Sequence, residues 1–405
     1  MVAFIPLIFF SSLAQVSDAR LPVCERPAVN ATWNAISGNH TASSAIYIEP
    51  SAFVASRQGE VLLAGEPTLV WHAGAADPEV NSVVGVQLNA RAEVVRFIPS
   101  SVFPEGASVG LRTAQIDSSS WLFVGPVKTT SGQQVVSARW DGKNWTAATT
   151  LPSTSPARPL PEFGTGIVNV AGGVALVMPA QFPDGLRVLA LYRFVSNRWR
   201  VNLFRPQVTG QAALSYKEAE GLALAATGIW SSREGRSANI LVYTEKHGWN
   251  RPKYVVRLPS TGTVHELAWS SDQDASALIW TALADSRGDL EAWAIRDVFA
   301  DSASPKRMAK HLANHVEYLV GGGEWRNRFL WVITQEYPNG ERRLKVLDVD
   351  DEVTVLYDQP NIFDATVKAL WKTPDELWIA GGAEKTAQGR TIIESRLLRL
   401  MFRCG

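Results

Sequence analysis

Residues 135–151 read VVSARWDGKNWTAATTL, in which an apolar segment is followed by the polar turn Trp140-Asp141-Gly142-Lys143-Asn144-Trp145 and a second segment. Apolar segments on either side of a Gly-containing turn predict a β-hairpin. Residues 188–204 (VLALYRFVSNRWRVNLF) and 240–256 (ILVYTEKHGWNRPKYVV) repeat the pattern, with Trp199 and Trp249 in the place of Trp145. One hairpin type, repeated along the chain, therefore decides the fold.

The repeat has a length of about fifty residues, because Trp145, Trp199 and Trp249 are spaced by that interval and Trp33 lies two such steps upstream. Four short strands per unit of this length are typical of a β-propeller, whose blades bury their faces against one another. We expect an all-β chain in which residues 20–405 form one β-propeller of seven four-stranded blades; six or eight blades also fit the uneven steps. The tryptophans that recur in every unit are expected to be core residues: Trp33, Trp145, Trp199, Trp249, Trp280, Trp331 and Trp378.

The last unit lacks an outer strand. Its inner strands are predicted at residues 368–371, 377–381 and 395–402, and the sequence stops at Gly405. Residues 25–37 would supply the missing strand from the N-terminus and close the ring. Cys24 would then lie beside Cys404, and the two cysteines of an exported protein usually pair. We expect a Cys24–Cys404 disulfide, worth nominally more than about 4 kcal/mol on the chain-entropy model; two unrelated buried thiols are the alternative.

The N-terminus predicts export. Residues 2–10 are apolar, small polar residues follow, and Ser17 and Ala19 suit a signal peptidase, so residues 1–19 are interpreted as a signal peptide. We expect a secreted or periplasmic monomer without a membrane span. The Asn-x-Thr sequences at Asn30, Asn39 and Asn144 would be glycosylation sites in a eukaryotic secretory pathway.

Composition narrows the function. Lys plus Arg and Asp plus Glu number 39 each, so the chain has no net charge to attract a nucleic acid. The string Gly106-Ala107-Ser108-Val109-Gly110 lacks the following helix that a serine hydrolase needs. His311 and His315 are four residues apart but are not part of an H-E-x-x-H motif, so we expect no metal site. We also expect no cofactor.

The hairpin at 140–145 resembles the W-D-G-x-x-W repeat of secreted β-propellers, a grouping that includes sialidase-like and kelch-like rings. It differs from the sialidase Asp-box, S-x-D-x-G-x-x-W, because Asp141 and Trp145 are one residue too close together. The resemblance implies a fold and carries no activity with it.

Ligands of a propeller usually sit at the mouth of the central channel, formed by the entries of the inner strands and by the loops between second and third strands. Glu266 and Glu317 are also candidate catalytic acids, because two carboxylates at the right separation hydrolyse glycosidic bonds. The structural alternative is that polar residues line a wet channel and satisfy one another. The candidate ligand-binding residues at this mouth are Arg112, Trp230, Arg233, His265, Glu266, His315, Glu317, Tyr337 and Arg390.

The absence of a catalytic motif favours a binding module that recognises a glycan or a protein segment, with an extracellular or periplasmic protein as the partner in the second case. A sialidase-like glycoside hydrolase or lyase is the alternative hypothesis. A purely structural secreted protein is the third.

Overall fold

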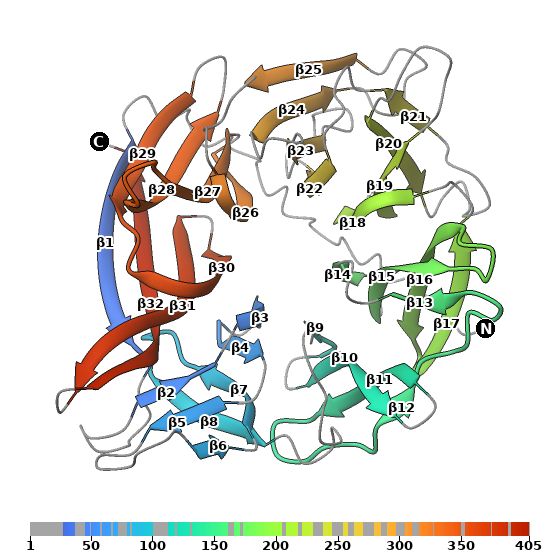
Figure 1. Cartoon of the computed structure of the whole chain (residues 1–405), viewed down its shortest axis with the longest axis horizontal. Helices are drawn as coiled ribbons and strands as arrows, with labels where there is room; N and C mark the ends of the chain where they lie inside the picture. The colour runs from blue at the N-terminus through green and yellow to red at the C-terminus, as the bar shows by residue number, and fades with distance from the viewer. Residues whose placement is uncertain are drawn as a thin grey trace, which may run out of the picture.

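The computed structural model is all-β, as expected from the sequence: each regular element in the part of the chain that it describes is a strand, and the sheets are arranged around a common axis (Figure 1). No helix in this part is long and apolar enough to cross a bilayer. The structure describes residues 27–36, 45–48, 50–56, 59–65, 68–71, 79–81, 83–99, 112–117, 120–129, 132–160, 166–170, 173–204, 208–217, 221–229, 238–244, 254–257, 263–269, 279–284, 290–296, 304–309, 316–326, 328–349, 353–373, 375–387 and 390–404.

Antiparallel sheets follow one another along the chain, and we number the larger ones from one to seven. The first contains β3 (Pro50–Ala55), β4 (Val61–Gly65), β7 (Val83–Leu88) and β8 (Val94–Pro99). The second contains β9 (Arg112–Gln115), β10 (Trp121–Thr129), β11 (Gly132–Trp140) and β12 (Thr149–Thr150). The third contains β13 (Arg158–Pro159), β14 (Gly166–Val170), β15 (Gly173–Gln181), β16 (Arg187–Val195) and β17 (Arg198–Phe204).

The remaining sheets complete the circuit seen in Figure 1. The fourth contains β18 (Val208–Lys217), β19 (Gly221–Ile229), β20 (Ala238–Thr244) and β21 (Tyr254–Arg257). The fifth contains β22 (Thr263–Trp269), β23 (Ile279–Ala284), β24 (Leu290–Arg296) and β25 (Ser304–Ala309). The sixth contains β26 (Val316–Trp325), β27 (Arg328–Glu336), β28 (Arg342–Val349) and β29 (Val353–Pro360). The seventh contains β30 (Phe363–Thr373), β31 (Glu376–Ala387), β32 (Arg390–Cys404) and β1 (Pro27–Ala35), and a small sheet contains β2 (Ala45–Tyr47), β5 (Thr68–Trp71) and β6 (Glu79–Asn81).

The seventh sheet joins the two ends of the described chain. β1 pairs antiparallel with β32, from Pro27 opposite Cys404 to Ala35 opposite Arg396, and lies along it in Figure 1. The predicted pairing of the N-terminal segment with the last strands is therefore confirmed. Cys24 lies outside the described residues.

The core is divided into clusters, each between two neighbouring sheets. Successive side chains of a strand point to opposite faces of its sheet. On β4, Leu62 accordingly packs with Phe123 of the second sheet, whereas Leu63 packs with Trp378 of the seventh. A strand that is covered by a neighbouring sheet on both faces favours apolar residues at successive positions, which explains the nearly continuous apolar runs of β4, β15 and β27.

The repeated tryptophans are not all core residues. Trp331 and Trp378 are fully buried, as expected. Trp33 is 38% exposed and therefore not in the core; it lies on the edge strand β1, opposite Leu398, with its ring centroid 5.5 Å from that of Phe363. Trp145 and Trp199 are only partly buried. Trp249 and the side chain of Trp280 lie outside the described residues.

Residues 152–160 are mostly irregular but contain the short strand β13, which pairs with β15 through Arg158 opposite Gln181. Gly323 lies within β26, where a Cβ atom would collide with the indole of Trp371.

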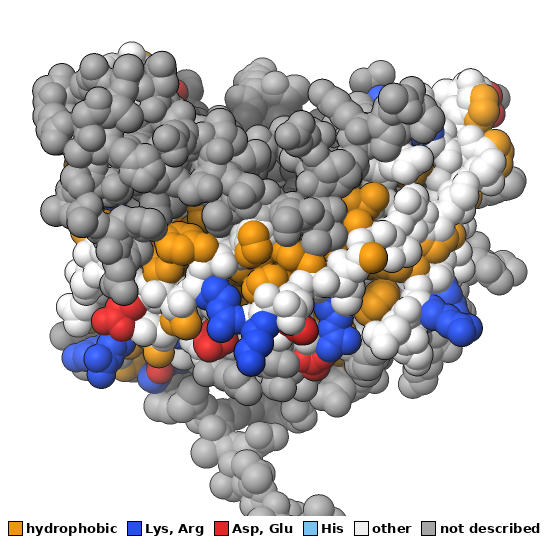
Figure 2. All heavy atoms as spheres, turned by 90° about the horizontal axis from the view of Figure 1, so that it is seen from below, with side chains coloured by type: hydrophobic (Ala, Val, Ile, Leu, Met, Phe, Trp, Pro, Cys, Tyr) orange, Lys and Arg blue, Asp and Glu red, His pale blue; other side chains and the backbone are white. Residues whose placement is uncertain are grey.

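The outer side of the ring carries charges of both signs. Figure 2 views the ring edge-on, and among the side chains drawn in colour the basic and acidic groups are interspersed along one rim beside a hydrophobic band. This distribution agrees with the zero formal net charge of the chain.

Candidate binding site

A pocket of about 700 Å³ opens between the second and third sheets. One wall comes from β10, β11 and the segment that follows the 141–144 turn, and the other from the β16–β17 hairpin. Aromatic, hydroxyl and guanidinium groups all contribute. The lining residues are Leu122, Ser137, Ala138, Arg139, Thr146, Ala147, Thr149, Thr150, Pro152, Phe194, Asn197, Arg198 and Trp199.

The aromatic wall depends on the tight β16–β17 turn. Val195 pairs with Arg198, which leaves a two-residue loop, and Ser196 and Asn197 have φ angles of 52° and 58°. Two consecutive positive φ angles are the mark of a type I′ hairpin turn. The turn places Trp199 beside Phe194, with ring centroids 5.1 Å apart.

Trp199 also connects the two sheets. Its indole Nε1 donates a hydrogen bond of 2.9 Å to Ser137 Oγ on β11, and its ring meets Tyr192 edge-on at 6.4 Å. Tyr192 is fully buried, and this burial raises its pKa to about 12. The orientation of the Trp199 ring is thus set by contacts on both sides of the pocket.

Trp145, at the corresponding position of the second sheet, makes a similar connection. Its Nε1 donates to the carbonyl oxygen of Pro99 at 2.7 Å, and its ring lies 4.9 Å from that of Phe123. The tryptophan after the hairpin turn therefore reaches back to the preceding sheet in both units. This contact explains the recurrence of the residue better than full burial does.

Arg139 is held on the second sheet by two acceptors. Its Nη2 donates 2.8 Å hydrogen bonds to Asp117 Oδ2 and Ser120 Oγ, both from the β9–β10 connection. One third of the side chain remains exposed. The guanidinium is therefore fixed in position beside the pocket without being sealed off from solvent.

The 141–144 turn lies between Arg139 and Thr146, which both line the pocket. Asp141 Oδ1 accepts hydrogen bonds from the backbone N–H groups of Asn144, at 2.7 Å, and Lys143, at 2.8 Å. These bonds stabilise the carboxylate and lower the pKa of Asp141. Thr146 Oγ1 then accepts the backbone N–H of Arg139 at 2.9 Å, which fixes the chain at the pocket edge.

Those residues predicted at the channel mouth whose backbone the structure describes lie at the other end of the sheets. The inner strand β26 begins where β27 ends, since Val316 pairs with Gln335, and the β27–β28 turn carries Tyr337 at that end. The pocket adjoins turns between third and fourth strands, which are at the opposite end of an antiparallel sheet.

The backbone positions of several mouth candidates are defined. Arg112 begins β9, and Arg390 begins β32. His265, Glu266 and Glu317 lie at register shifts near the starts of β22 and β26. Their side chains lie outside the described part, as do Trp230, Arg233 and His315 entirely, so their role in binding stays a prediction.

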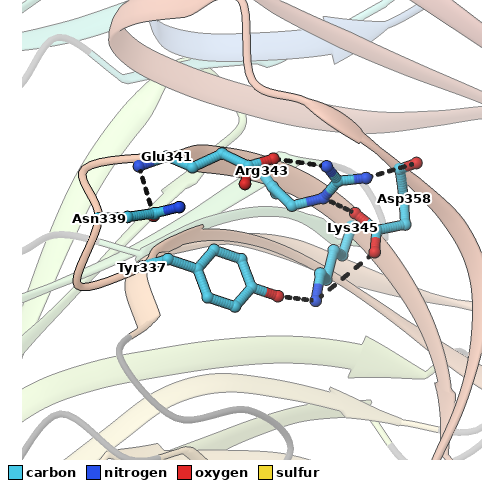
Figure 3. A network of polar contacts seen from close by, with 6 residues as sticks. All are labelled: Tyr337, Asn339, Glu341, Arg343, Lys345 and Asp358. Carbon is cyan, nitrogen blue, oxygen red and sulfur yellow. Dashed lines mark hydrogen bonds and ion pairs between the residues drawn. The ribbon is translucent and has the colours of Figure 1, made fainter.

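Tyr337 takes part in a polar network of the sixth sheet (Figure 3). Lys345 Nζ donates to its hydroxyl at 2.7 Å and lies 3.7 Å from Asp358 Oδ2. Arg343 donates to Asp358 and to Glu341, which raises the pKa of Arg343. The geometry accounts for Tyr337 as part of this network; its predicted contact with a ligand stays a prediction.

Sequence reasoning missed Arg139 and Thr146 and placed Trp199 in the core. A signal was nevertheless present in β11, where Val136, Ala138 and Trp140 share one face and pack against the first sheet. Ser137 and Arg139 alternate with them and therefore face the third sheet. Two polar residues on a strand face that meets another sheet indicate a polar gap between the sheets.

The solved structures establish the fold. The chain is similar to the BP39L lectin of Burkholderia pseudomallei, with 12% identity, a TM-score of 0.51, and coverage of 86% of this chain and 98% of the lectin. The chain has a β-propeller-like fold. A Dyadobacter fermentans protein described as of unknown function (12% identity, TM-score 0.46, coverage 93% and 100%) and the WD40 domain of SCAP from fission yeast (10%, 0.45, 88% and 98%) are less similar. No protein-family model and no curated protein matches the chain.

Proposed function

We propose that this protein is an exported, seven-bladed β-propeller that binds a glycan in the pocket between the second and third sheets. The observation that carries the proposal is the composition of that pocket. The similarity to a lectin structure supports the β-propeller fold. The chemistry of the pocket lining supports a glycan as the ligand.

The pocket suits a sugar in size and in chemistry. Its volume of about 700 Å³ falls within the usual range of small-molecule sites, roughly 300–1,000 Å³. The apolar C–H face of a sugar ring packs on aromatic rings, which Trp199 and Phe194 provide. The hydroxyl group of Thr146 and the guanidinium of Arg139 supply polar partners for sugar hydroxyls.

Seven blades and a closing disulfide belong to the same proposal. Seven sheets of four or five strands among the described residues support the blade number. Pro27 lies opposite Cys404 in the strand pairing, and Cys24 is only three positions before Pro27 in the sequence. No free thiol occurs in the described part of the chain. Both facts support a Cys24–Cys404 link, which peptide mass mapping without reduction tests directly.

Export and glycosylation complete the proposal. Asn30 on β1 and Asn144 in the 141–144 turn are exposed, as acceptor residues must be, whereas Asn39 lies outside the described residues. N-terminal sequencing of the mature protein tests the proposed cleavage after Ala19.

An oligosaccharide array with two matched variants tests the function. Trp199→Ala removes the aromatic wall, and we expect at least a tenfold loss of affinity for the glycan that the natural protein binds. Trp33→Ala makes the same chemical change at an exposed tryptophan of the seventh sheet, and we expect unchanged binding. No binding to any oligosaccharide, or equal binding by the two variants, would overturn the proposal.

The mouth residues form a separate prediction within the same experiment. Glu266→Gln and Glu317→Gln are expected to leave binding at the pocket unchanged, because both residues lie at the other end of their sheets. The hydrolase hypothesis is tested with the same two variants on aryl glycosides. Glycosidic turnover that both substitutions abolish would favour that hypothesis.

A further inference from the structure

Among the described residues that line the pocket, the charged side chains are all of one sign. Arg139 and Arg198 contribute guanidinium groups, and no Asp, Glu, Lys or His is in this described lining. Asp117, which holds Arg139, lies on the β9–β10 connection and is not one of the lining residues. Within the described part of the chain, the charge of Arg139 is therefore compensated and that of Arg198 is not.

Arg139 has more hydrogen-bond donors than its protein partners use. An arginine side chain carries five N–H groups, and Asp117 and Ser120 both bind at Nη2. Nε is buried without an acceptor, and Nη1 forms no hydrogen bond with any residue in the described part of the chain. A buried donor without a partner is unfavourable, so a ligand acceptor at Arg139 would complete hydrogen bonds that its described protein partners leave unmade.

Arg198 faces the same pocket from the opposite wall. It follows the type I′ turn at the start of β17, is exposed, and forms no hydrogen bond or ion pair with another described residue. The Trp199–Ser137 hydrogen bond fixes this hairpin against β11, which carries Arg139. The two guanidinium groups thus belong to walls whose spacing is set by the fold.

We infer that the ligand of this pocket is an acidic glycan, whose carboxylate or sulfate group is bound by Arg139 and Arg198. The inference rests on the proposed glycan-binding function and specifies its ligand class. The planar guanidinium matches the two oxygens of a carboxylate or sulfate and forms charge-assisted hydrogen bonds. The aromatic wall binds the ring of the sugar, and the arginines select its charge.

Calorimetric titration with three matched oligosaccharides tests the inference. They share one backbone and carry a neutral hydroxyl, a carboxylate or a sulfate ester at the same position. We expect the acidic forms to bind at least tenfold more tightly than the neutral form, and added salt to reduce this difference. The comparison between carboxylate and sulfate identifies which anion is the ligand.

Two arginine variants provide the structural control. Arg198→Gln is expected to lower the affinity for the acidic oligosaccharide about tenfold while leaving the neutral one within about twofold. Arg200→Gln removes an exposed arginine of the same strand that does not line the pocket, and is expected to change neither affinity. Both substitutions are at exposed positions, so the variants should fold.

The outcomes separate this inference from the proposed function. Equal affinity for acidic and neutral forms, or equal effects of Arg198→Gln and Arg200→Gln, would overturn the acidic ligand while the glycan-binding function stands. Failure of all three oligosaccharides, together with a negative array, would overturn both.

Discussion

Tyr192 illustrates how a single side chain responds to its place between two sheets. It packs among apolar residues of the second and third sheets, beside Trp199, and has no exposed surface. Ionisation of its hydroxyl would place a charge in this core, which is why the pKa rises to about 12.

We expect Tyr192 to make the protein sensitive to alkali. Its raised pKa favours the neutral form in the folded state, so its contribution to stability is complete below the unfolded pKa near 10 and is lost between about pH 10 and pH 12. Near pH 11 the loss should reach about 1 kcal/mol. Urea unfolding near pH 9 and pH 11 measures this loss of unfolding free energy. In the Tyr192→Phe variant, the free energy of unfolding should differ less between the two pH values. An identical difference in both proteins would contradict the assignment.

Residue roles were the least predictable from sequence. The recurrence of tryptophan correctly indicated contact between units, since Trp145 and Trp199 each donate a hydrogen bond to the preceding sheet. Their partial burial was not predictable, because it depends on how far the neighbouring sheet extends beside them. Trp33 shares the local sequence pattern but lies on the edge strand β1 and is 38% exposed.

At the scale of elements, the 140–145 turn was identified from sequence, and its chemistry follows from Asp141. The Asp141 carboxylate accepts hydrogen bonds from two backbone N–H groups of the turn, which is a common role of Asp in turns. The short strand within 152–160 was not predicted, because the Pro and Ser content of this segment suggests a loop whereas its residues Ala157 and Leu160 are buried. The local amino-acid composition therefore predicts the turn, but it does not predict which residues of a loop-like segment are buried.

We expect Asp141→Ala to lower the thermal unfolding midpoint near neutral pH, because Lys143 and Asn144 lose their acceptor. The pKa of Asp141 is lowered in the folded state, so this stabilisation is present above its ordinary value of 3.8 and is lost as the pH falls through the folded value. Scanning calorimetry at neutral and strongly acidic pH should show the two proteins converging in acid. Asp141→Asn keeps an uncharged acceptor and serves as the control, because its unfolding midpoint should differ from that of Asp141→Ala by an amount that does not depend on pH.

The whole molecule was predicted most fully, because its architecture depends on a pattern repeated along the chain rather than on any one residue. The all-β class and the completion of the last sheet by the N-terminal segment both followed from counting strands per unit. The position of the pocket did not, since it depends on which gap between sheets remains unfilled. Ser137 and Arg139 in place of apolar residues open that gap, and only the packed sheets show its size.

Ring closure leads to a prediction about stability. In a closed ring every sheet covers its neighbours, so separating β1 from β32 would uncover side chains such as Val29, which packs against the cluster between the sixth and seventh sheets. If Cys24 and Cys404 are linked, the disulfide holds β1 and β32 together at this last contact of the ring, which we call the seam. Serine at both positions should then lower the free energy of unfolding by roughly 2–5 kcal/mol.

Urea unfolding of the natural protein, with and without reductant, and of the Cys24→Ser, Cys404→Ser double variant measures this contribution. Reductant should lower the midpoint of the natural protein to that of the variant and leave the variant unchanged. Binding of the glycan by the variant should persist, because the pocket lies between the second and third sheets, away from the seam. Equal midpoints in all conditions would show that strand pairing alone closes the ring, and that the apolar contacts of β1 are sufficient to hold it.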